Sequence, residues 1–158
     1  MAGNILNKYG SSGQAITCTI TSLTTTSLRG STAVDNTANT FTDSLVMVKV
    51  KTGASSTSAT GYVDVYAYGT SDGGTDYSAG FAGTDGAFSG QTSALFRLGR
   101  IAAVANATTY VGGPWSVASA FGGSLPDHWG IVVDNESGST LDASVGSSWY
   151  QGVEGQYT

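Results

Sequence analysis

The sequence predicts an all-β protein, a jelly-roll-like β-sandwich of about eight strands with at most one short helix. Apolar and polar residues alternate with a period of two in several segments, and this alternation is typical of strands with one buried face. Val, Thr and Tyr are common while Leu and Ile are sparse, and β-branched and aromatic side chains suit a pleated sheet. Short Gly-, Ser- and Asp-rich stretches separate the alternating segments, as turns do in sandwiches.

The chain divides into a flexible N-terminal arm, residues 1–13, and a single β-sandwich domain, residues 14–158. A chain of 158 residues fits one domain and can fill a sandwich core. The arm ends in the sequence GSSG and has little to bury. We therefore expect it to be disordered unless a neighbouring molecule holds it.

Three strands are predicted in the first half of the chain. Residues 16–20 alternate Ile and Cys with Thr, residues 44–51 place three valines on one face, and residues 61–68 place Val and Ala opposite Tyr and Asp. The tyrosines of the last segment are large and amphipathic. They are expected either to cover an edge of the core or to contact another molecule.

Residues 69–90 are predicted to form a long irregular excursion, because Asp, Gly, Ser and Thr dominate there. The aromatic side chains of Tyr77, Phe81 and Phe88 are expected to anchor it. Loops of this length are uncommon in compact domains and are often functional.

Two strands and a short helical segment are predicted next. Residues 95–105 read as a strand bent near Gly99, and residues 108–111 as a short strand ended by Gly112, Gly113 and Pro114. Residues 116–121, followed by Gly122, indicate one or two helical turns with glycine as the stop.

A hairpin is predicted near the C-terminus, with strands at residues 128–134 and 140–145. The turn between them, residues 135–138, contains Asn and Gly, which tolerate positive φ. The last residues, 149–158, are again aromatic and polar.

The charge content excludes several classes of partner. Charged residues make up 11% of the chain, the formal net charge is −5 and the pI is about 4.4, so binding to nucleic acid or to anionic lipid is not expected. No apolar run is long enough to cross a membrane, and no secretory signal is visible. Protein interfaces are depleted in Lys and Glu. The composition therefore favours a protein that contacts copies of itself or a larger assembly.

No catalytic constellation is recognisable, and we expect no catalytic residue, no cofactor and no bound metal. The single histidine, His128, and the single cysteine, Cys18, cannot supply the four ligands of a zinc site. Cys18 is expected to be a small core residue. A cation held by the acidic residues of the loop from Asp72 to Asp85 stays an open alternative, because carboxylates are suitable calcium ligands.

The segment at residues 121–141, FGGSLPDHWGIVVDNESGSTL, and the closing segment YQGVEG at residues 150–155 carry a resemblance to a known group of proteins. They resemble a module of small virion proteins of tailed bacteriophages, whose core reads LP-x-x-WGIVV-x-N-x-[ST]-G-x-x-L. The resemblance implies a non-enzymatic structural protein of the virion, made in the host cytoplasm. Capsid decoration proteins, head fibres and tail components could all contain such a module.

The length and the strand pattern favour a capsid decoration, or cement, protein that forms a homotrimer and binds the major capsid protein. Multivalent contacts of this kind stabilise a head by avidity on a repeating lattice. The predicted interface residues are Tyr62, Tyr66, Tyr68, Trp149, Tyr150 and, in the arm, Asn4 and Tyr9. The alternatives are a tail tube or tip component, and a carbohydrate-binding receptor-recognition module that uses Trp115, Trp149 and Tyr77. An enzyme is the third and weakest hypothesis.

Overall fold

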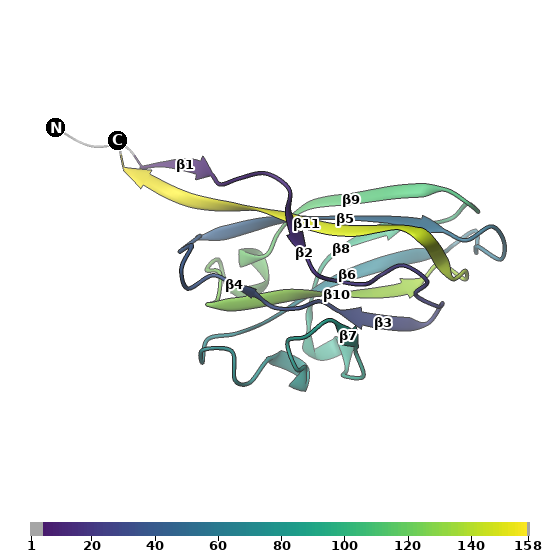
Figure 1. Ribbon diagram of the computed structural model, residues 1–158, viewed down its shortest axis with the longest axis horizontal. Helices are drawn as coiled ribbons and strands as arrows, with labels where there is room; N and C mark the ends of the chain where they lie inside the picture. Colours follow the sequence, from purple (N-terminus) through teal and green to yellow (C-terminus); the bar gives the residue numbers. More distant parts are fainter. Residues whose placement is uncertain (1–4, 158) are drawn as a thin grey trace.

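A computed structural model describes residues 5–157 and shows two antiparallel β-sheets (Figure 1). Sheet A has the order β1-β11-β5-β9, and β2 also pairs with β11. Its strands are β1 (Ile5–Tyr9), β2 (Gln14–Ile16), β5 (Asp43–Thr52), β9 (Thr109–Ser116) and β11 (Leu141–Tyr157). Sheet B has the order β7-β3-β10-β6-β8, and β4 also pairs with β10. Its strands are β3 (Ser27–Gly30), β4 (Val34–Asp35), β6 (Tyr62–Thr70), β7 (Gly86–Ala87), β8 (Phe96–Ala102) and β10 (His128–Glu136).

The predicted all-β sandwich is confirmed. Eight of the strands in the described residues have four residues or more, and β2, β4 and β7 add short pairings. Helical structure among residues 5–157 is limited to three short 3₁₀ turns, η1 (Ser78–Gly80), η2 (Thr92–Ala94) and η3 (Ala118–Phe121). The last of these is the predicted helical segment, and it ends at Gly122, which takes φ +75°.

The core lies between the two sheets and is built from the alternation seen in the sequence. In β5 every second side chain is buried, including three valines, and β6 and β10 contribute the facing layer. Because successive side chains of a strand point to opposite faces, a period-two sequence buries one whole face at once. The fully buried members include Val46, Val48, Val50, Val63, Val65, Trp129, Ile131 and Val133.

The outer face of sheet B is partly covered by the excursion at residues 71–90. Tyr68, predicted as an interface residue, is 0% exposed there. Its ring packs edge-on against Phe81, 4.9 Å between centroids, and against Tyr77, 5.5 Å. Its hydroxyl donates a 2.6 Å hydrogen bond to the Ser31 carbonyl. The predicted anchoring of the excursion is therefore confirmed, and the placement of Tyr68 in an interface was wrong because these aromatic side chains shield it from solvent.

The edge between β3 and β11 is closed by residues 17–24, which include most of the strand predicted at residues 16–20. These residues bond to β11 and to the link between β3 and β4. Leu141 N donates to Leu23 O at 2.9 Å and Ser22 N to Asp142 O at 3.4 Å, while Thr32 N donates to Thr17 O at 2.8 Å. Ile20 is 1% exposed, because the segment crosses the end of the core. The alternation thus predicted correctly which side chains are buried, but the strand pairing with β11 stops at Ile16.

Two strands run further than their sequence patterns indicated. β9 continues through Gly112, Gly113 and Pro114 to Ser116, because a register shift opposite Val46–Val48 accommodates the irregular backbone. β11 joins the predicted return strand and the final segment into one strand of 17 residues, with an irregularity between Leu141 and Gly146.

The hairpin predicted for residues 128–145 is wrong. β10 pairs within sheet B and β11 within sheet A, so residues 137–140 carry the chain from one sheet to the other and the two strands do not pair. Asn135 is fully buried, and its Nδ2 donates to Leu23 O at 2.9 Å and to Ser139 O at 2.8 Å. Its Oδ1 accepts hydrogen bonds from the N–H and hydroxyl of Ser137, at 3.1 and 2.7 Å. Gly138 takes φ +81°, which an L side chain adopts only with strain. The Asn-x-Ser-Gly pattern therefore serves the turn and its attachment to the segment at residues 17–24.

Candidate assembly surface

β1 and the C-terminal end of β11 form a two-stranded ribbon that extends past the body of the sandwich (Figure 1). The pairing is antiparallel and runs from Ile5 opposite Tyr157 to Tyr9 opposite Val153. Gly13, at φ +68°, turns the chain so that β2 rejoins β11. Residues 5–9 of the predicted arm are therefore a strand, and all five of them are exposed.

The ribbon has two unlike faces, because side chains alternate along each strand and directly paired residues share a face. One face carries Ile5, Tyr9 and Tyr157, which are 77%, 56% and 73% exposed. The opposite face carries Lys8 and Glu154, whose charged groups lie 2.7 Å apart, together with Gln156 and one apolar residue, Leu6, which is 54% exposed. The ribbon is thus amphipathic, with an uncharged apolar face that this chain leaves open to solvent.

The same side of β11 continues onto the outer face of sheet A. Trp149 lies opposite Met47 on β5 and Ala15 on β2, and these three side chains share this outer face. A hollow of about 260 Å³ lies here, lined by Ser12, Gly13, Leu45, Met47, Pro114, Trp149 and Gln151. At the β9 side, Val111 is 52% exposed. We call the apolar ribbon face and this outer face together the assembly surface.

The structure brings two of the predicted interface residues, Tyr9 and Trp149, onto the assembly surface. Tyr150 was placed wrongly in the interface, because it follows Trp149 directly in a strand and must point inward. It is 5% exposed, packs edge-on against Trp129 at 5.2 Å and donates a 2.8 Å hydrogen bond to Gln14. Asn4 lies outside the described residues.

Tyr62 and Tyr66 lie elsewhere, on the outer face of sheet B. The Arg100 guanidinium lies 3.5 Å from the centroid of the Tyr62 ring and bonds the buried carboxylate of Asp64 through two contacts of 2.7 Å. Hydrogen bonding to Asp64 raises the pKa of Arg100 above its usual range. Both tyrosines are half-buried, and Tyr62 serves an intramolecular cluster. This places the two tyrosines apart from the assembly surface.

Several residues of the assembly surface were not predicted from the sequence. Ile5 and Tyr157 are the most exposed large apolar residues of the described chain, yet they stand far apart in sequence. The alternation of Ile5, Asn7 and Tyr9 was a usable signal for a strand with one apolar face. The signal for Tyr157 appears only when β11 is paired with β1.

The single histidine and the single cysteine, which were considered for chemistry, lie apart from each other in unlike surroundings: His128 beside two carboxylates and Cys18 in the core. The ring nitrogens of His128 lie 3.6 Å from Asp127 and 3.8 Å from Asp35, beyond hydrogen-bond distance. Burial raises the pKa of the Cys18 thiol to about 12, which keeps it protonated and unreactive. Among residues 5–157, no three His, Cys, Asp or Glu side chains are grouped as a metal site would require.

The acidic loop residues hold backbone groups of their own chain. Asp72 accepts hydrogen bonds from the N–H groups of Thr75 and Asp76, each at 2.9 Å. Asp85 bonds Arg29 at 2.7 Å, and that bond, with those from Thr19, lowers its pKa to about 2 despite the opposing effect of burial. Asp72 therefore stabilises its own turn, whereas Asp85 ties the excursion to Thr19 and Arg29.

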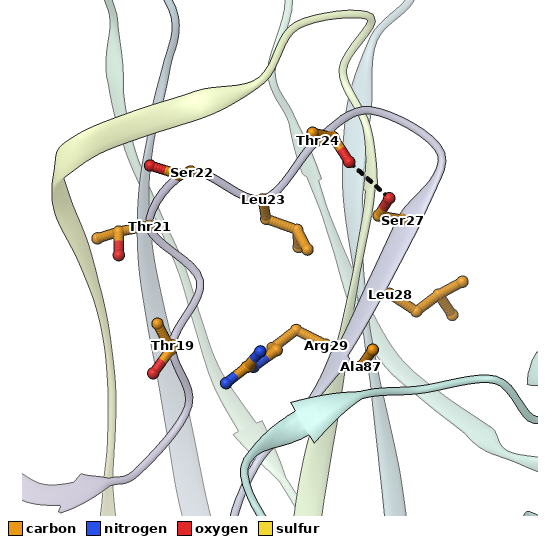
Figure 2. A pocket seen from close by; sticks show the side chains of 9 residues that line it. All are labelled: Thr19, Thr21, Ser22, Leu23, Thr24, Ser27, Leu28, Arg29 and Ala87. Carbon is orange, nitrogen blue, oxygen red and sulfur yellow. Dashed lines mark hydrogen bonds between the residues drawn. The ribbon is translucent and has the colours of Figure 1, made fainter.

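The hollow beside Arg29 is a recess of mixed polar and apolar lining at the closed edge of the sandwich. Figure 2 shows hydroxyl side chains of Thr19, Ser22 and Thr24 around it, and Leu23 points across it. Its volume is about 270 Å³. Arg29 is tied to Asp85, so its charge is already compensated.

The aromatic residues considered for sugar stacking do not form a platform. Trp149 lies on the assembly surface, Tyr77 packs on Tyr68 over sheet B, and Trp115 packs against the core. Stacking on a sugar ring needs exposed rings on a common face. The three rings are distributed over three different environments.

Neither a protein-family model nor a curated protein matches this chain. Within the described residues, no helix has the length and apolar character needed to span a membrane.

Proposed function

We propose that this chain is a non-enzymatic structural protein of a bacteriophage virion, of the capsid decoration type, which stabilises the head as a homotrimer bound to the major capsid protein. The assembly surface supports this proposal most directly. It carries the side chains of Met47, Val111 and Trp149, with Lys49 beside Val111, and it ends in a projecting ribbon that has one uncharged apolar face.

The physical reason is that burying such a surface against a partner lowers the free energy. Large apolar side chains exposed together are unfavourable in water and mark interaction sites. Contacts that are individually weak become strong when many copies bind a repeating lattice. The sandwich behind the surface, with its closed core, supplies a stiff support that does not have to reorganise on binding.

The main alternative is a tail component, which would use the same surface to form rings. A receptor-recognition module that binds carbohydrate is less well supported, since Trp149 is the single ring of the proposed platform that lies on the assembly surface.

Binding to heads tests the proposal. Purified full-length protein is incubated with heads of the encoding phage from which the protein has been removed, and the bound fraction is measured after sedimentation. We expect wild type and the Tyr66→Ala control to bind and Trp149→Ala to be depleted, because only Trp149 lies on the assembly surface. Absence of wild-type binding, or equal binding of the two variants, would overturn the proposal.

Native mass spectrometry of the same protein distinguishes the alternatives. A trimer is expected for a decoration protein, and a closed ring of six would indicate a tail component instead. A monomer that binds a glycan through Trp149 would favour the carbohydrate-binding module.

A further inference from the structure

The projecting ribbon carries an inference about how copies of this chain meet. We propose that the face formed by Ile5, Tyr9 and Tyr157 packs against the same face of other copies, so that the ribbons form the centre of the oligomer. The inference rests on the proposed function and names the contact within it.

The first argument is the ribbon's stability. A two-stranded antiparallel ribbon is marginal in water by itself and needs a third layer or a packed face. Beyond the body of the sandwich the ribbon has neither, since all five residues of β1 are exposed. The apolar face has three large side chains, and it becomes a packed face that stabilises the ribbon once a second such face covers it.

The second argument is electrostatic and selects the occupant. The paired segments, residues 5–9 and 153–157, contain one positive residue, Lys8, and one negative residue, Glu154, so their net charge is zero in a chain of net charge −5. Copies of an acidic chain therefore approach with least repulsion at the ribbon. The apolar face carries no charge at all, and a charged partner surface would lose its hydration there without compensation. A second copy presents an equal, uncharged face.

The third argument concerns which face turns inward. Lys8 and Glu154 pair across the strands on the opposite face, 2.7 Å apart, and their side chains are 55% and 31% exposed. The charged groups of this face are paired and in contact with water, and Leu6 is its single apolar side chain, against three large ones on the other face. The oligomer we propose therefore buries Ile5, Tyr9 and Tyr157 and leaves the ion pair outside.

Adjacent residues of β1 provide a matched test, because they point to opposite faces. Ile5→Asp puts a charge on the apolar face, and Leu6→Asp puts the same charge on the ion-paired face. Oligomer dissociation is measured by sedimentation velocity over a dilution series of the full chain. We expect Ile5→Asp to weaken association by roughly a hundredfold or more and Leu6→Asp by less than about threefold. Circular dichroism checks that both variants keep the sandwich.

Disulfide trapping gives a second, independent measurement. Asn7 lies in the middle of the apolar face and Gln156 on the opposite face, while the native Cys18 is buried. Under mild oxidation we expect Asn7→Cys to form covalently linked pairs and Gln156→Cys to remain unlinked.

The outcomes separate the two proposals. An oligomer that survives Ile5→Asp, equal effects of the Asp variants, linking through Gln156→Cys, or a monomeric wild type would overturn the ribbon contact. Head binding by the wild type is measured independently, and its presence would keep the proposed function even then. Conversely, ribbon-mediated association with no binding to heads would leave this contact standing and overturn the decoration role.

Discussion

Arg100 holds the carboxylate of Asp64 through two parallel hydrogen bonds, Nε to Oδ1 and Nη2 to Oδ2, each 2.7 Å long. Asp64 is 2% exposed, so this carboxylate depends on its cation rather than on water. The contact joins the neighbouring strands β6 and β8 on the outer face of sheet B. It also fixes Tyr62 beneath the guanidinium.

Removal of this cation is expected to destabilise the sandwich. In Arg100→Ala the remaining cation near Asp64 is Arg97, whose Nη1 lies 3.5 Å away and whose side chain is 52% exposed. Because breaking a bidentate pair strands a buried charge, Arg100→Ala should lower the urea midpoint clearly more than the control Arg97→Ala. Tryptophan fluorescence follows the unfolding. Equal losses from the two variants would contradict the prediction.

Asp134 is expected to make stability fall as the pH rises. Burial, together with the carboxylates of Glu136 and Asp64, raises its pKa from 3.8 to about 6. Between about pH 4 and pH 6 the folded chain keeps a proton that the unfolded chain has lost, so this group's contribution is full below about pH 4 and is lost as the pH passes about 6.

The test compares unfolding free energies across that pH range. Asp134→Asn removes the titrating group and should flatten the decline and be more stable than wild type at pH 7. Asp76→Asn, a substitution at an exposed loop position, is the control and should keep the wild-type slope. A slope unchanged in Asp134→Asn would refute the assignment.

Asn135 is expected to be the polar residue most sensitive to truncation. Asn135→Ala leaves the buried N–H of Ser137 without its Oδ1 acceptor, and it removes one of two hydrogen bonds at each of the carbonyls of Leu23 and Ser139. Loss of buried hydrogen bonds with unsatisfied partners costs on the order of 3 kcal/mol here. Asn39→Ala, at an exposed position with one 3.5 Å contact, should cost little. Chemical denaturation measures both, and comparable losses would argue against a special role for Asn135.

Gly130 is expected to tolerate no side chain. A Cβ at this position would lie 2.4 Å from atoms of the Tyr68 ring, which is fully buried between sheet B and the excursion. Overpacking of this kind costs about 1–3 kcal/mol, so thermal unfolding of Gly130→Ala should begin at a lower temperature. At Gly86 the nearest atom is 3.7 Å away, and Gly86→Ala should be close to neutral. A stable Gly130→Ala would mean that Tyr68 moves without cost.

Much of the fold could be predicted because its signals are local. The alternation in β5 and β6, the glycine stop at Gly122 and the positive φ of Gly138 each depend on a few neighbouring residues. Errors arose where pairing partners are remote. The alternation at residues 16–20 predicted which side chains are buried, but it could not show that the strand paired with β11 ends at Ile16.

The candidate surface was only partly predictable for the same reason. Of the two neighbours Trp149 and Tyr150, one had to face inward, but the sequence did not say which one. Tyr68 would be exposed on a bare sheet, and it is buried because aromatic residues of the excursion fold back over it.

The chain's amino acids alone determined an all-β class, the burial alternation of its strands and a surface poor in charge, because each follows from composition or from spacing of a few residues. Only the tertiary structure decided that β1 pairs with the end of β11, across almost the whole chain. That pairing sets Ile5 beside Tyr157 and creates an apolar face that neither segment shows by itself. The physical reason is that side-chain direction is set by local geometry, whereas the neighbours that cover or expose a side chain are set by contacts between distant residues.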